Sequence, residues 1–200
     1  MKCEKLLEDI KRLSDEDIYN KFIIGGEIWY FKMRFDNQWY RYYDEFKLFI
    51  SKKLEVHYND IAVAGSAKLG FSINPNKKLK AFDNSSDIDI VIISRKYFYM
   101  FWDAYIQDSY SEIKINNFNK IHFSIFRKYI DLEGFSKKNE TYTNWLKKTQ
   151  GFEKDLQLEF DIEHNVHYRI FESWDSAKVY YMSSIKKLRR SIEENIDEDK

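Results

Sequence analysis

Cysteine, proline and glycine are scarce in this chain. Among its 200 residues there are one cysteine, one proline and six glycines. Because the single cysteine, Cys3, has no second cysteine to pair with, an intrachain disulfide is excluded, which fits a reducing compartment. The scarcity of proline and glycine predicts short loops and many helices.

Excess charge and long apolar runs are also missing. The chain has 33 basic and 33 acidic side chains, so its formal net charge is zero. This balance argues against a protein that coats nucleic acid through its overall field, although it allows a local basic patch. No run of 18 apolar residues and no signal peptide is present, so we expect a cytoplasmic protein without membrane contact.

The most informative segment, 63–94, joins two apolar runs. The first run, 61–64, ends at Gly65-Ser66, and short β-branched runs bounded by glycine are typical of buried strands. A glycine at this point lets backbone N–H groups approach a bulky anion, and the serine hydroxyl adds a donor. The pattern is compatible with phosphate binding, but a Gly-Ser pair alone is equally typical of a turn.

The second run, 87–93, alternates Asp87 and Asp89 with isoleucines. Because side chains alternate across a strand, both aspartates are expected on one face. Carboxylates spaced in this way can hold Mg²⁺ or Mn²⁺ together with substrate phosphates. By itself Asp-Ile-Asp also suits the solvent face of an exposed strand, but the apolar run 91–93 predicts a buried strand, where carboxylates are costly.

The combination resembles the nucleotidyltransferase superfamily typified by DNA polymerase β, whose motif is Gly-Ser or Gly-Gly after a strand and Asp-x-Asp on the following strand. Gly65-Ser66 matches the first element, and Asp87 and Asp89 match the second. The stretch GSAKLGFS, ending at Ser72, is also similar to the Gly-Ser-x-x-x-Gly-Thr form of oligoadenylate and cyclic-dinucleotide synthases. The resemblance is specific only over residues 36–95.

The resemblance implies an α+β fold, in which a nucleotidyltransferase-like core of a small mixed sheet is packed by helices, with extra N- and C-terminal helices. We expect an N-terminal helical segment at 1–35, the core at 36–172, and a C-terminal helix with an acidic tail at 173–200. From the pattern of apolar residues and caps, helices are expected at 3–13, from Ser14 to the Gly25-Gly26 pair, and at 39–53, 96–107, 119–130 and after Ser173.

The resemblance also implies an enzyme that moves an NMP from an NTP, with ATP as the expected substrate, to an acceptor hydroxyl with release of pyrophosphate. Asp87 and Asp89 would hold the metal ion. The residues expected to contact the nucleotide are Gly65, Ser66, Lys68, Ser72 and Arg169. The acceptor stays open between a protein, an RNA or tRNA end, a nucleotide and a small molecule.

Two other classes of function stay open. One is a catalytically inactive member of the same fold, which binds a nucleotide or a partner protein such as a toxin or a defence-system component. The other is a pure interaction module, for which an exposed apolar patch on an aromatic helix would be the signature.

A third carboxylate separates these alternatives, because the superfamily usually has one on a later strand. Asp161 has the required setting if 158–163 is a strand, and it would then complete the metal and catalytic set. Alternatively 152–160 ends a helix and only 166–171 is the strand, and periodicity does not distinguish the two. If the third carboxylate is absent, the inactive alternative gains.

Further candidates are less specific. Arg169, within the 166–171 run, can pair with a phosphate or form a structural salt bridge. His164 and His167 are three residues apart, but without a helical His-Glu-x-x-His pattern or a cysteine pair we expect no zinc site. Basic residues at 186–190 predict a solvated helix face, with an RNA or triphosphate contact as the alternative.

Overall fold

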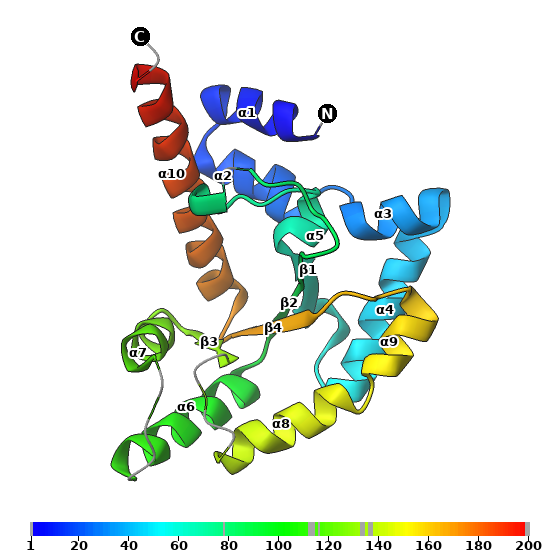
Figure 1. Ribbon diagram of the computed structural model, residues 1–200, viewed down its shortest axis with the longest axis vertical. Helices are drawn as coiled ribbons and strands as arrows, with labels where there is room; N and C mark the ends of the chain where they lie inside the picture. Colours follow the sequence, from blue (N-terminus) through cyan, green and yellow to red (C-terminus); the bar gives the residue numbers. More distant parts are fainter. Residues whose placement is uncertain are drawn as a thin grey trace.

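A four-stranded mixed sheet surrounded by helices forms the described part of the chain (Figure 1). The computed structural model describes residues 2–77, 79–111, 115, 117–132, 135 and 138–198. The strands are β1 (Ile61–Ala64), β2 (Ile88–Ile93), β3 (Tyr129–Asp131) and β4 (Val166–Phe171). The expected α+β class with a small mixed sheet is confirmed.

Helices make up most of the remaining structure. They are α1 (Lys2–Arg12), α2 (Asp15–Ile18), the π-helix η1 (Tyr19–Ile24), α3 (Trp29–Phe35), α4 (Trp39–Leu54), α5 (Gly65–Leu69), α6 (Arg95–Tyr110), α7 (Phe118–Phe126), α8 (Glu140–Gln150), α9 (Glu153–Phe160) and α10 (Trp174–Glu198). The expected helices at the two ends of the chain, at 39–53 and at 96–107 are confirmed. Ser14 and Ser173 accept hydrogen bonds from backbone N–H groups at the starts of α2 and α10, as caps do.

The strands follow the order β1-β2-β4-β3, with β2 and β4 parallel and the two outer pairs antiparallel. The register places Asp89 between Ala64 of β1 and His167 of β4. It also places Arg169 of β4 opposite Asp131 of β3. Because residues two apart on one strand share a face, the acidic and basic residues of β2, β3 and β4 lie on the same face of the sheet.

Different helices cover the two faces of the sheet (Figure 1). On one face Ile88, Ile90 and Ile92 are fully buried in a cluster that includes Phe46 of α4. On the other face Val91 packs in a second cluster with apolar residues of α1, α2 and α10. The two aspartates of the 87–93 run alternate with the buried isoleucines and therefore lie on this second face.

The interpretation of 158–163 as a strand is wrong. Phe152, Leu156 and Phe160 are spaced by four and buried, so the segment forms α9 and ends at Asp161 in the left-handed conformation. The alternative, a helix followed by a strand at 166–171, is confirmed. The helix expected at 119–130 is also shorter than predicted, because Lys128 has a φ of 62° and the chain then enters β3.

The domain boundaries at 35 and 172 stay predictions. In the structure Tyr30 and Phe31 of α3 belong to the same buried cluster as Phe46 of α4. The 67–86 segment, which connects the two apolar runs, begins inside α5 and contains a short bridge between Phe71 and Ala81.

The outer edge of β1 is protected by Tyr43 of α4, and this contact predicts a stability effect. The buried Val63 N–H donates to the Tyr43 hydroxyl at 3.2 Å, and burial raises the pKa of Tyr43 to about 12. Tyr43→Phe keeps the ring packing but leaves this N–H without a partner, which is expected to lower the free energy of unfolding by about 1–2 kcal/mol. Urea unfolding measures the loss. Tyr40→Phe, at a residue 60% exposed, is the control and should change stability by less than about 0.5 kcal/mol. Equal stability of the two variants would contradict the prediction.

Candidate functional site

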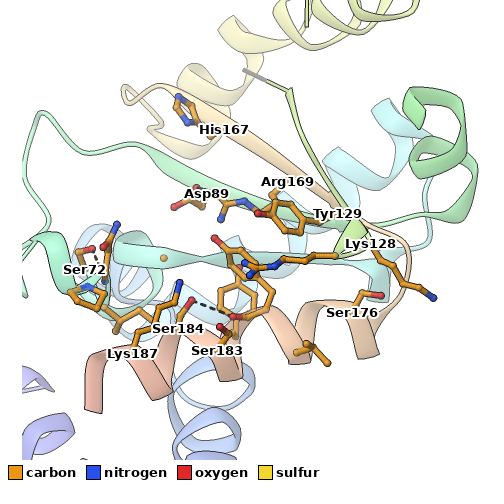
Figure 2. A pocket seen from close by; sticks show the side chains of 18 of the residues that line it. Ser72, Asp89, Lys128, Tyr129, His167, Arg169, Ser176, Ser183, Ser184 and Lys187 are labelled. Atoms are coloured by element: carbon orange, nitrogen blue, oxygen red, sulfur yellow. Dashed lines mark hydrogen bonds and ion pairs between the residues drawn. The ribbon is translucent and has the colours of Figure 1, made fainter. Parts of the chain in front are cut away.

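A cleft of about 1580 Å³ lies over the charged face of the sheet. Its walls come from the start of α5, the 72–77 segment, β2, β4, the 126–129 segment and α10. Figure 2 shows Asp89 and Arg169 on the sheet side, and Ser183, Ser184 and Lys187 on the α10 side. The cleft therefore joins segments that are far apart in the sequence.

Gly65 connects β1 to α5 at the floor of the cleft. Its φ of 62° lies in the left-handed region, which favours glycine. A Cβ at this position would also overlap the Oδ2 atom of Asp89. Glycine is therefore required for two reasons. Because it has no side chain, the backbone of the Gly65-Ser66 turn packs directly against the carboxylate of Asp89.

Both aspartates of the 87–93 run reach the cleft. The side chains of Asp87 and Asp89 are 39% and 27% exposed. Nε2 of His167 lies 3.9 Å from Oδ1 of Asp87, and Nη2 of Arg169 lies 3.9 Å from Oδ1 of Asp89. Each carboxylate thus faces a side chain of the parallel strand β4 at a distance that leaves its oxygens open to a further partner.

Arg169 is a fixed positive charge within this face. Burial acts to lower its pKa, but the surrounding oxygens outweigh burial and hold the pKa above its ordinary value. In order of effect, these oxygens belong to Tyr180, Tyr181, Asp89 and Asp131. The guanidinium also lies 5.2 Å from the centre of the Tyr180 ring, which adds a cation–π contact.

Tyr181 was not among the predicted site residues, since its spacing marks it only as part of the apolar stripe of α10. In the structure it lines the cleft, and its buried hydroxyl donates to no acceptor among the described residues. Burial raises the pKa of this hydroxyl, with Arg169 nearby acting in the opposite direction. A buried donor without an acceptor is costly, so Tyr181 marks a place where a ligand could supply the missing bond.

Lys187 and His167 also line the cleft, although the sequence did not predict them as site residues. The basic residues at 186–190 do not form one solvated face: Lys187 and Arg190 line the cleft, whereas Arg189 bonds to Asp15 at 2.9 Å. His167 could have been found from its position two residues before Arg169 on an expected strand, because these two side chains must share a face.

Six of the eight predicted site residues line the cleft: Gly65, Ser66, Ser72, Asp87, Asp89 and Arg169. Lys68 does not; it is buried within α5 at 4% exposure. Asp161 does not either, because it ends α9 and pairs with Arg34 at 2.7 Å. The prediction that Asp161 lies on a strand beside the two aspartates is therefore wrong, and Asp161 does not supply a third carboxylate to the cleft.

Asp87 and Asp89 are the two predicted metal ligands that reach the cleft. Among the described residues no group of three or more His, Cys, Asp or Glu side chains gathers closely enough to hold a metal ion. Asp87 and Asp89 alone suffice for Mg²⁺ when substrate phosphates and water complete its oxygen ligands.

The part of the chain that the structure describes also contains no helix with the length and apolar character of a membrane span.

Comparisons of this chain with protein-family models, with curated proteins and with solved structures find no match. The sequence pattern and the geometry of the cleft are therefore the basis for a functional proposal.

Proposed function

We propose that this chain is a metal-dependent nucleotidyltransferase with a nucleotidyltransferase-like core. It moves an NMP from an NTP, with ATP as the expected substrate, to an acceptor hydroxyl and releases pyrophosphate. One observation carries the proposal: the Gly65-Ser66 turn packs against Asp89 in a single cleft, although 20 residues separate Ser66 from Asp87. The order of strand, Gly-Ser turn, short helix and antiparallel strand with Asp-x-Asp supports the same assignment.

Each residue has a role that its position supports. The backbone of Gly65 and the hydroxyl of Ser66 bind phosphate oxygens. Asp87 and Asp89 would hold Mg²⁺ or Mn²⁺, which, when bound, supplies positive charge against the charge that develops on the phosphates. The cleft volume, about 1580 Å³, exceeds the roughly 300–1,000 Å³ of a typical small-molecule site, which leaves room for an acceptor beside the nucleotide.

In the transfer, the acceptor oxygen forms a bond to the α-phosphorus while the bond to the pyrophosphate oxygen breaks. The proton of the acceptor hydroxyl needs a base in the position where a third carboxylate would act. His167 of β4, whose Nε2 lies 3.9 Å from Oδ1 of Asp87, is the side chain that we propose for this role. The protein contributes mainly orientation and fixed charge.

A second function is nucleotide binding without transfer, in which the bound state recognises a partner protein such as a toxin or another defence-system component. The observation that favours it is the composition of β4. His167 lies opposite Asp89, the guanidinium of Arg169 lies 3.9 Å from the Asp89 carboxylate, and Asp161 lies outside the cleft.

Incubation of the protein with each α-labelled NTP, in Mg²⁺ and then in Mn²⁺, tests the proposal. Total tRNA, host lysate protein and lysate small molecules are the acceptor pools. We expect pyrophosphate release and label on one acceptor class. Bound nucleotide without label in any pool would support the second function, and neither binding nor label would contradict both.

A further inference from the structure

The strand beside the two aspartates carries a cation where a two-cation site requires a carboxylate. β4 runs parallel to β2, with His167 opposite Asp89 and Arg169 two residues further on the same face. Nη2 of Arg169 lies 3.9 Å from Oδ1 of Asp89. A second divalent cation at this point would meet a permanent positive charge, since a guanidinium is not deprotonated in proteins.

Other carboxylates near β4 are already engaged. Asp131 shares the face with Arg169 but lies on its far side from Asp89, and Lys120 pairs with it at 3.1 Å. Glu172, which follows β4, is held by Lys128 at 3.0 Å and by the hydroxyl of Tyr99 at 3.2 Å. Neither is placed with Asp87 and Asp89 as a further metal ligand.

The surroundings of Arg169 hold its guanidinium in the cleft. Asp131 of β3 lies opposite it in the register of the sheet, the Asp89 carboxylate lies 3.9 Å from its Nη2, and the Tyr180 ring supports it from α10. Its side chain is still 28% exposed, so one side of the guanidinium faces the cleft. Figure 2 shows Arg169 pointing from the sheet toward the space above α10, next to Asp89.

Tyr181 adds a second donor at the same place. Its hydroxyl is buried, lines the cleft and donates to no acceptor among the described residues. Burial raises the pKa of this hydroxyl, Arg169 lowers it through its charge and a side-chain hydrogen bond, and Asp89 raises it. A ligand oxygen beside the guanidinium would give this hydroxyl the acceptor that it lacks.

We infer that this site takes one divalent cation, at Asp87 and Asp89, and that Arg169 serves as its second positive centre. The guanidinium donates to phosphate oxygens of the bound nucleoside triphosphate, and the Tyr181 hydroxyl donates beside it. This inference rests on the proposed function, because it describes how that cleft receives a triphosphate. The chemistry suits Arg169, since a guanidinium binds phosphate oxygens in a two-pronged manner.

Counting bound Mn²⁺ by electron paramagnetic resonance tests the inference without any turnover. The full chain is saturated with the non-hydrolysable α,β-methylene analogue of ATP, and the Mn²⁺ bound per complex is measured. One ion is expected for the unaltered protein and for Arg169→Lys, which keeps the charge. Arg169→Asp replaces the cation by a third carboxylate, so a second ion is expected in that variant.

Arg169→Met separates charge from packing. It is expected to weaken binding of the same analogue about 10- to 100-fold in calorimetry, with the ion count unchanged at one. Circular dichroism establishes that each variant is folded. Two ions in the unaltered protein, or one ion in a folded, nucleotide-binding Arg169→Asp variant, would overturn this inference alone. Absence of nucleotide binding by the unaltered protein would overturn the proposed function and this inference with it.

Discussion

Replacement of Asp89 by asparagine is expected to lower the rate of nucleotide transfer about 10³-fold. Asparagine has nearly the same size, so it fits against Gly65 as the aspartate does. It loses the negative charge that would hold the divalent cation, and Arg169 loses one of its two flanking carboxylates. Because charge at this point acts in a partly enclosed cleft, its removal should affect catalysis much more than stability.

The measurement is the initial rate of pyrophosphate release at saturating NTP, with thermal unfolding measured on the same preparations. Asp103→Asn is the matched control, because it makes the same chemical change at an exposed position of α6 outside the cleft. The control should keep its full rate. An Asp89→Asn protein that is folded and as active as the control would rule out the proposed transferase mechanism.

Replacement of Gly65 by alanine is expected to weaken nucleotide binding about 10²-fold, although only one methyl group is added. The added Cβ would overlap the Asp89 carboxylate, so either the turn or the aspartate must shift. The φ of 62° adds backbone strain for any residue with a Cβ, and the free energy of unfolding should fall by about 1–3 kcal/mol. Calorimetry with the ATP analogue and urea unfolding measure the two effects.

Gly26→Ala isolates the backbone contribution. Gly26 also has a positive φ, 76°, but the nearest atom to its added Cβ, the carbonyl oxygen of Lys21, lies 3.4 Å away. This turn lies outside the cleft. The variant should lose stability while it binds nucleotide normally. Equal nucleotide affinity in Gly65→Ala and Gly26→Ala would show that the Gly65–Asp89 packing is not needed for binding.

Local patterns were sufficient for most helices and for two strands. The apolar stripes of α1, α4 and α10 and the glycine- or serine-marked ends depend on residues a few positions apart, which periodicity and capping describe well. The strand prediction for 158–163 was wrong because six residues are compatible with both an alternating and a helical pattern of apolar side chains. The segment forms a helix because Phe152, Leu156 and Phe160, at intervals of four, are buried together. Their burial depends on the other residues of the core cluster that they contact.

The sequence by itself determined that a Gly-Ser turn and an Asp-x-Asp strand occur in the order expected of a triphosphate site. Only the tertiary structure decided what stands beside them. Parallel pairing of β2 with β4 joins residues about 80 positions apart, and its register is set by packing across the whole sheet. That pairing places His167 and Arg169 next to the aspartates and leaves Asp161 outside the cleft. The return of α10 over the same face then adds Tyr181, whose buried hydroxyl donates to no acceptor in the described part of the chain. These contacts are non-local: short-range spacing predicts that His167 and Arg169 share a face of their strand, but not that this face lies beside the aspartates.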